Sequence, residues 1–190
     1  MESVDLLNDF IETPIQSNIS KTKYPCTGFC YLAIKYKKNL LNLFLLKKRQ
    51  EYFDFISKLI RDAGERKNKN KNINCDGEFI NQETIKNDFP EIYDTISFKD
   101  LGIASDLDLE IFINNIFIDI MDLSLNDCLI INRSSETFLA IKIDQEDFLI
   151  IDSHQNKHGI VQLENLIDYI TKFKKYRGNI QIGFGYSQID

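Results

Sequence analysis

Apolar residues recur with the period of an α-helix along much of the first 125 residues. This spacing predicts helices over residues 2–12, from Cys26 to Tyr36, and over residues 39–65 with a break near Lys47-Lys48-Arg49. Residues 107–123 are rich in Ile, Leu and Phe, and we expect them to form a buried helix. The first part of the chain is therefore predicted to be mainly helical.

Polar and low-complexity segments separate these predicted helices. We expect a polar loop from Gln16 to Pro25 and a solvated loop over Arg66 to Asn74, where Lys and Asn alternate. A short helix is predicted over residues 83–89, because Pro90 follows it and disfavours helical backbone in the residue before it.

The last third of the chain has the pattern of strands. Three short runs rich in β-branched and aromatic residues, joined by turn-like RSSE and DQED, predict an antiparallel meander: residues 128–132, 137–143 and 148–152. After them the pattern predicts an edge segment over 159–162, an amphipathic helix over 163–175 and a final strand over 179–184. Helices followed by strands indicate the α+β class.

A length of 190 residues fits one domain, with a helical part over about 1–125 and a sheet part over about 126–190. We find no internal repeat and no linker that would divide it. No apolar run approaches the 18 or so residues of a spanning helix, so no membrane contact is expected. The N-terminal sequence MESVDLLNDFIETP is acidic and lacks the pattern of a secretion signal, which predicts a cytoplasmic protein.

Charge and cysteine content narrow the classes of partner. The net charge is −6, from 23 Lys and Arg against 29 Asp and Glu, and an acidic chain repels phosphate backbones. Nucleic-acid binding is therefore not expected. A negatively charged protein is better suited to a basic partner. Without a secretion signal, the four cysteines (Cys26, Cys30, Cys75 and Cys128) are expected to be free thiols in a reducing compartment.

The chain has only two histidines, His154 and His158. If the strand of residues 148–152 continues through His154, the side chains of Asp152 and His154 lie on the same face, because alternate residues of a strand share a face. A carboxylate beside an imidazole fixes its tautomer and stabilises the imidazolium. The alternative is an ordinary surface turn. The His154–His158 spacing does not suit a zinc site on such a segment, and we expect His158 to be a loop residue beside a tight turn at Gly159.

Cys26 is the candidate nucleophile. It follows Pro25 and begins a predicted helix, where the unpaired N–H groups and the helix dipole favour a thiolate and can receive an oxyanion. Cys30 is expected to be a small core residue. Gln16 and Asn18 lie upstream in the loop, and either amide could donate to the oxyanion. A cysteine at an early helix start and a later Asp-x-His is the chain order of papain-like cysteine proteases.

Two segments resemble one particular family. Cys26-Thr-Gly-Phe-Cys30-Tyr-Leu-Ala is similar to the nucleophile segment of the deubiquitinase domain of herpesvirus large tegument proteins and their relatives. CLIINRSSETFLAIKIDQEDFLIIDSHQNKHGI is similar to the final meander of that domain, which ends in Asp-x-His. The resemblance covers roughly residues 16–36 and 126–169. It differs at Pro25 and Phe29, where the family usually has Gln and often has Asn.

This resemblance implies a papain-like fold in which N-terminal helices pack on a C-terminal antiparallel sheet. It also implies a cysteine deubiquitinase that cleaves after the terminal Gly-Gly of ubiquitin. By the same resemblance Cys26 is the nucleophile, His154 the general base, Asp152 its orienting partner and Gln16 the oxyanion donor, with Asn18 as the alternative donor. No cofactor or metal is expected, the partner is ubiquitin or polyubiquitin, and we expect a monomer in the cytoplasm, or in the host cytoplasm for a virus or intracellular bacterium.

Two other functions remain open from the sequence. A papain-like acyltransferase or deamidase would use the same triad on a different acceptor. A non-catalytic interaction module would use Cys26 only as a structural residue, with a thiol that titrates near its ordinary value of about 8.5.

Overall fold

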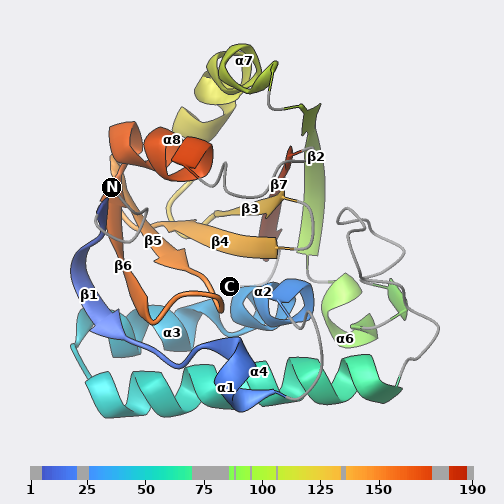
Figure 1. Ribbon diagram of the computed structural model, residues 1–190, viewed down its shortest axis with the longest axis vertical. Coiled ribbons are helices and arrows are strands. Elements are labelled where there is room, and N and C mark those ends of the chain that lie inside the picture. Colours follow the sequence, from blue (N-terminus) through green and yellow to red (C-terminus); the bar gives the residue numbers. More distant parts are fainter. Residues whose placement is uncertain are drawn as a thin grey trace.

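A computed structural model shows one antiparallel sheet between two layers of helices (Figure 1). It describes residues 6–20, 26–69, 86–87, 89–94, 96–105, 107–133, 136–172 and 180–187. Among these residues the sheet has seven strands in the order β1-β6-β5-β4-β3-β7-β2. The strands are β1 (Asn8–Glu12), β2 (Ile96–Ala104), β3 (Cys128–Arg133), β4 (Glu136–Lys142), β5 (Asp147–Ile151), β6 (Lys157–Gln162) and β7 (Ile180–Ser187).

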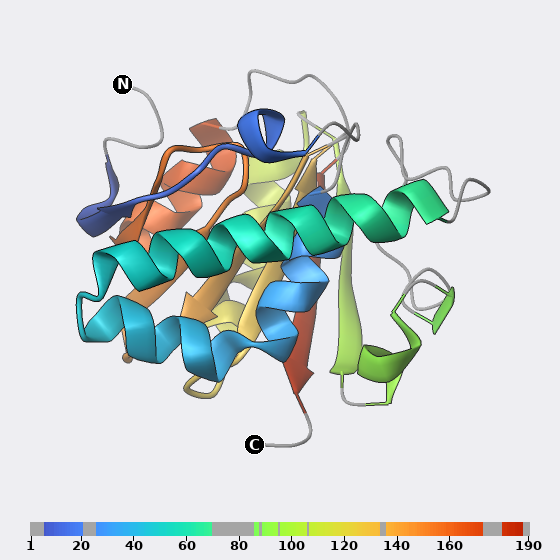
Figure 2. The same cartoon turned by 90° about the horizontal axis from the view of Figure 1, so that it is seen from below.

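The helices cover both faces of the sheet. Helices α2 (Cys26–Lys35), α3 (Lys37–Leu45) and α4 (Arg49–Lys69) pack on one face, and α7 (Leu109–Met121) and α8 (Leu163–Lys172) on the other. Two short helices, α1 (Gln16–Ile19) and α6 (Pro90–Tyr93), complete the described elements. Seen from below, α3 and α4 cross in front of the sheet (Figure 2).

The alternation of side chains in the central strands produces two separate cores. In β4, Leu139 and Ile141 join the cluster beneath α2, α3 and α4, whereas Phe138 and Ala140 join the cluster beneath α7 and α8. The central strands are buried on both faces, which explains why their sequences are continuous apolar runs and not polar–apolar alternations.

The structure confirms the α+β class and most of the predicted elements. Helices α2, α3, α4 and α7 lie where the helical spacing predicted them, and the break between α3 and α4 falls at the basic residues 47–48. The meander is present as β3, β4 and β5, all antiparallel, and the final strand is β7. Helix α8 covers 163–172 of the predicted 163–175, and the rest lies outside the described residues.

Other predictions were wrong. Residues 8–12 form strand β1 and not the end of a helix, because they pair with β6, almost 150 residues later, with a bulge after Asn8. Strand β2 was not predicted, so the first 125 residues contribute two strands to the sheet. Segment 157–162 is not an edge, because β6 lies between β1 and β5.

Smaller corrections concern loops and helix ends. Helix α1 occupies part of the predicted loop 16–25, and α4 continues through residues 66–69 of the predicted loop 66–74. Of the predicted helix over 83–89, only residues 86–87 and 89 are described, and residues 86–87 are helical. Pro90 begins the next helix, α6. Among the described residues, no helix is long and apolar enough to cross a membrane.

Candidate active site

The segment Asp152-Ser153-His154 forms a turn directly after β5. The strand ends at Ile151, so the two side chains do not meet through strand alternation as predicted. Instead, one oxygen of Asp152, Oδ1, accepts hydrogen bonds from the backbone N–H of His154 at 3.0 Å and from its ring nitrogen Nδ1 at 2.9 Å. The predicted carboxylate–imidazole pair is therefore present, held by the turn and not by a strand.

Cys26 is the first residue of α2 and is almost completely buried. Beside it, the Thr27 hydroxyl contacts the Thr137 hydroxyl of β4 at 2.9 Å, which anchors the start of the helix to the sheet. The Cys26 side chain lies close enough to the His154 ring to influence its protonation. The fold therefore brings together two residues that are 128 positions apart in the sequence.

The electrostatics of His154 favour its protonated form. Burial alone would lower the pKa of His154, but hydrogen bonds to Asp152 and Cys26 and the negative charge on both partners outweigh burial and raise the pKa well above 6.5. A protonated imidazole beside a cysteine sulfur can stabilise negative charge on that sulfur and can later donate a proton.

Gln16 begins α1 and lies against the same turn. Its side-chain oxygen Oε1 accepts a hydrogen bond from the Ser153 hydroxyl at 2.7 Å, and its backbone N–H donates to the Ser153 carbonyl at 2.8 Å. With Oε1 engaged, the amide Nε2–H₂ of Gln16 is the end that can donate to a substrate. Asn18 is exposed, so the structure favours Gln16 over Asn18 as the amide of the site.

His158 is a residue whose role the sequence did not predict. It belongs to β6 and is fully buried, which corrects the expectation of a loop residue. Its Nδ1 lies 2.9 Å from the hydroxyl of Tyr52 on α4, and its Nε2 lies 3.1 Å from the carbonyl oxygen and 3.2 Å from the backbone nitrogen of Asp152. Burial lowers the pKa of His158 to about 4, so its ring is neutral at pH 7. Tyr52 and His158 thus join α4 to the backbone of Asp152.

Tyr169 supports Asp152 from the opposite face of the sheet. This residue of α8 is buried, and burial together with the nearby Asp152 carboxylate raises the pKa of its phenol well above 10. The second oxygen of Asp152, Oδ2, is buried and forms no hydrogen bond of standard geometry among the described residues. Neither Tyr52 nor Tyr169 has a sequence signal that points to the site, because both look like ordinary residues on the apolar faces of helices.

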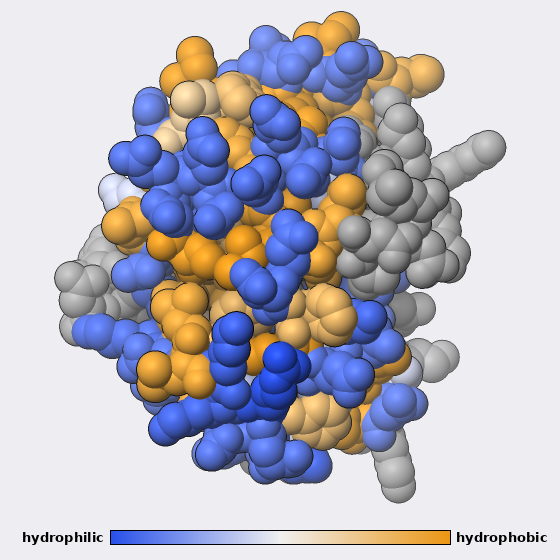
Figure 3. All heavy atoms as spheres, turned by 90° about the vertical axis from the view of Figure 1, so that its left-hand side faces the viewer, coloured by the Kyte–Doolittle hydropathy of each residue, from blue (hydrophilic) through white to orange (hydrophobic). Residues whose placement is uncertain are grey.

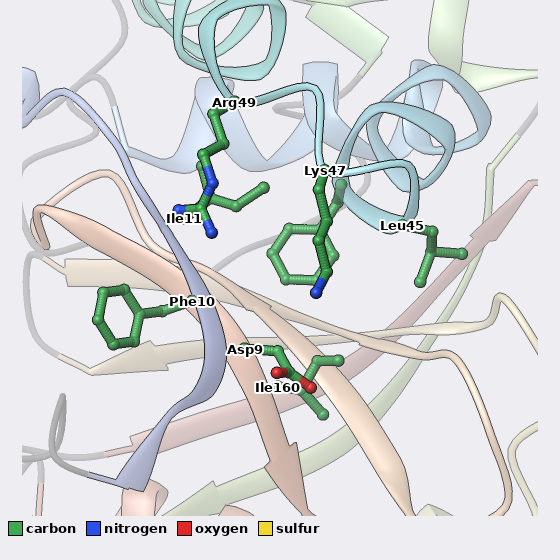
Figure 4. Close-up of a pocket in the computed structure, with 8 residues that line it drawn as sticks. Asp9, Phe10, Ile11, Leu45, Lys47, Arg49 and Ile160 are labelled. Carbon is green, nitrogen blue, oxygen red and sulfur yellow. The ribbon is translucent and has the colours of Figure 1, made fainter.

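Other polar and hollow features lie apart from this group. Cys30 and Cys128 are buried free thiols, and burial raises both pKa values, which suits core residues. A pocket of about 140 Å³ lies between β1, β6 and the α3–α4 connection (Figure 4). Figure 3 shows that apolar and hydrophilic groups are mixed on the face of the molecule that forms the left-hand side of Figure 1. The pocket is lined by Asp9, Phe10, Ile11, Phe44, Leu45, Lys47, Arg49 and Ile160, none of which belongs to the Cys26–His154 group. The described part of the chain contains no cluster of three or more residues suited to a metal ion.

Comparison with known proteins does not identify a family for this chain. No family model matches the sequence, and no curated protein matches it. The function must therefore be argued from the site itself.

Proposed function

We propose that the protein is a cysteine protease of papain-like architecture that hydrolyses the peptide or isopeptide bond after the terminal Gly-Gly of ubiquitin. The observation that carries this proposal is the contact of the Cys26 thiol at a helix start with the His154 ring, which in turn is held by the buried carboxylate of Asp152. A nucleophile, a base and an orienting group in this order are the components of acyl transfer by a thiol.

Each residue has a defined step in this proposal. The Cys26 thiolate attacks the carbonyl carbon of the terminal glycine, and the oxyanion that forms accepts a hydrogen bond from the side-chain amide of Gln16. Protonated His154 gives its proton to the leaving lysine amine, which breaks the C–N bond and leaves a thioester. His154 then takes a proton from water, and the resulting hydroxide attacks the thioester and breaks its C–S bond. The products are the Cys26 thiolate, protonated His154 and the carboxylic acid of ubiquitin, which gives its proton to solvent as ubiquitin leaves. Asp152 keeps the imidazole oriented throughout.

The choice of ubiquitin as substrate is supported by two sequence features. The segments around Cys26 and before His154 resemble those of tegument-type deubiquitinases, and the net charge of −6 suits the basic tail of ubiquitin. The small Gly-Gly end of that tail is also compatible with a buried nucleophile, because Cys26 has almost no exposed surface.

A ubiquitin suicide probe, in which an electrophile replaces the terminal glycine, tests this function. The wild-type protein is expected to form a covalent adduct whose mass equals protein plus probe, and Cys26→Ala is expected to form none. Cys30→Ala is the matched control, because Cys30 is a buried cysteine on the same helix that has no part in the proposed chemistry. Ubiquitin carrying a fluorogenic C-terminal amide then measures turnover.

The outcomes separate the three functions. An adduct that depends on Cys26 and turnover of the fluorogenic substrate support a deubiquitinase. If the probe gives no adduct while small alkylating reagents modify Cys26 selectively at neutral pH, the triad serves another acceptor, as in a transferase or deamidase. If Cys26 also resists alkylation in the folded protein, the site is not catalytic and the proposal is wrong.

A further inference from the structure

Ser153, the middle residue of the Asp152-Ser153-His154 turn, takes part in no step of the proposed reaction. Its side chain is completely buried, and its hydroxyl donates to Oε1 of Gln16 at 2.7 Å. Among the residues that the structure describes, this hydroxyl forms no other hydrogen bond. The backbone carbonyl of Ser153 also accepts the Gln16 N–H at 2.8 Å. Ser153 therefore holds Gln16 both at its backbone and at its side-chain amide.

Strand β1 brings Gln16 to this turn. Figure 1 shows β1 leading from the edge of the sheet into α1, whose first residue is Gln16. Beyond the end of β1, the Thr13 N–H donates to the Asn156 carbonyl at 2.8 Å, and the Thr13 hydroxyl donates to the Gln155 carbonyl at 3.3 Å. These contacts tie the segment before Gln16 to the turn, so the backbone is held in place without the Ser153 hydroxyl.

The Ser153 hydroxyl instead selects which end of the Gln16 amide is free. The oxygen and the NH₂ group of a Gln side chain have nearly the same shape, so hydrogen bonds choose between the two orientations of the amide. In the observed orientation Oε1 accepts the hydroxyl proton, and Nε2 is left to donate. In the reversed orientation Nε2 would donate to the hydroxyl oxygen, and the buried hydroxyl proton would lose its acceptor. The reversed orientation is therefore disfavoured.

We propose that Ser153 is a positioning residue that keeps the NH₂ end of the Gln16 side chain directed toward the oxyanion. This inference rests on the proposed function, because it concerns the oxyanion donor of the same reaction. Ser153 is the chain neighbour of His154, whose protonation the Cys26 side chain influences, so the Gln16 amide lies beside the reacting groups. A carbonyl oxygen turned toward the oxyanion would repel the developing negative charge, whereas an N–H stabilises it. Ser153 thus acts on the transition state through Gln16.

The test is a double-mutant cycle on kcat, with ubiquitin that carries a fluorogenic C-terminal amide as the substrate. The proteins compared are the wild type, Ser153→Ala, Gln16→Ala and the variant with both substitutions. Thr13→Val is the matched control, because it removes a buried side-chain hydrogen bond between the same two segments and does not touch the Gln16 amide. The ubiquitin suicide probe counts the reactive sites of each protein, so that kcat refers only to folded, competent molecules. Urea denaturation measures the stability of each variant.

We expect Ser153→Ala to lower kcat about tenfold and to change KM less than about twofold, because the oxyanion forms only after the substrate has bound. The loss is smaller than the roughly 10²–10³-fold expected for removing the donor itself, since an unrestrained amide still donates part of the time. In the Gln16→Ala background, Ser153→Ala should lower kcat less than about twofold further, because the residue through which it acts is absent. Thr13→Val should keep the wild-type kcat, even where its stability falls as much as that of Ser153→Ala.

Three results would overturn the inference and leave the protease intact. A wild-type kcat in Ser153→Ala would mean that the amide keeps its orientation without the hydroxyl. An equal loss of kcat from Ser153→Ala with and without the Gln16 side chain would mean that Ser153 acts on another group, such as His154. A loss of kcat in Thr13→Val as large as in Ser153→Ala would assign the effect to the contact between the two segments. If the wild type neither forms the probe adduct nor turns over ubiquitin, the proposed function itself is wrong, and the role of Ser153 is refuted with it.

Discussion

The pH dependence of stability tests whether His158, in β6, is buried and neutral in the folded protein. Burial lowers the pKa of His158 from 6.5 to about 4, against the opposing effects of the hydrogen bond to the Asp152 backbone and the Asp152 charge. Below about pH 6.5 the unfolded chain binds a proton at this position and the folded chain does not, so the free energy of unfolding falls as the pH falls. The loss continues until the pH reaches about 4. A difference of about 2.5 pKa units corresponds to about 3 kcal/mol.

Urea denaturation at pH 7, 6, 5 and 4 measures this loss when the wild type is compared with His158→Gln. Glutamine does not titrate, and its amide can still bond to the backbone of Asp152. Titration of the other groups is common to both proteins and cancels in the difference. We expect the wild type to lose about 3 kcal/mol more than the variant between pH 7 and pH 4. Parallel curves for the two proteins would refute a buried, neutral His158.

A second variant tests the contact between the Tyr52 hydroxyl and Nδ1 of His158. Tyr52→Phe removes the hydroxyl that lies 2.9 Å from Nδ1 of His158 and leaves the aromatic packing in place. The free energy of unfolding at pH 7 is expected to fall by about 1–3 kcal/mol, because a buried hydrogen-bonding group loses its partner. The steep pH dependence should remain, since the histidine is still buried. A variant as stable as the wild type would mean that the Tyr52–His158 contact contributes nothing.

The remaining predictions concern the turn around the site. Gln16→Ala is expected to lower kcat on the ubiquitin substrate by about 10²–10³-fold, because the oxyanion loses a hydrogen-bond donor. Asn18→Ala, in the same short helix, should change kcat little. Equal effects of the two substitutions would show that Gln16 is not the oxyanion donor. Asp152→Asn should lower kcat by about three to four orders of magnitude, because the His154 imidazole loses the charge that orients it, while probe binding stays unchanged. Steady-state kinetics on the fluorogenic ubiquitin substrate measure the change in kcat. Gly159→Ala places a Cβ 2.9 Å from the Asn8 carbonyl oxygen, so β1 must shift. The free energy of unfolding, measured by urea denaturation, should fall by about 1–3 kcal/mol. An unchanged free energy of unfolding would show that β1 adapts without cost.

The elements that could be predicted from the sequence are those whose pattern is local and strong. The helical spacing of α3 and α4 extends over several turns, and the basic residues between them mark the break. The three runs of the meander are short, apolar and bounded by turns, so each strand finds its partner in the next segment of the chain.

The elements that could not be predicted depend on partners far away in the chain. Residues 8–12 have the spacing of a helical face, yet their backbone pairs with β6. Strand β2 pairs with β7 more than 75 residues later, and its sequence has no clear alternation because Gly102 and a bulge interrupt it. Local propensity is a weak prior at such positions, and tertiary pairing overrides it.

The candidate site shows the same division. The pairing of Asp152 with His154 could be predicted from their closeness in sequence, although a turn and not a strand brings the two side chains together. The position of Cys26 at a helix start follows from Pro25 and the apolar stripe after it. The contacts of Ser153 with Gln16 and of His158 with Tyr52 join segments more than 100 residues apart. No pattern in one sequence reports such contacts, because each partner is a common residue in an unremarkable local context.

The burial of Asp152 indicates why these distant contacts exist. A turn that only joined two strands could leave its carboxylate in water at no cost, but Asp152 is fully buried and its Oδ2 forms no hydrogen bond of standard geometry among the described residues. Burying a carboxylate costs free energy unless hydrogen bonds and nearby groups compensate for the lost water. The fold offsets that cost from both faces of the sheet, with Tyr52 and His158 holding the Asp152 backbone and α8 closing over the carboxylate through Tyr169. A buried carboxylate held by contacts from several elements is expected where chemistry requires it, and Oδ1 of Asp152 is the oxygen that orients His154.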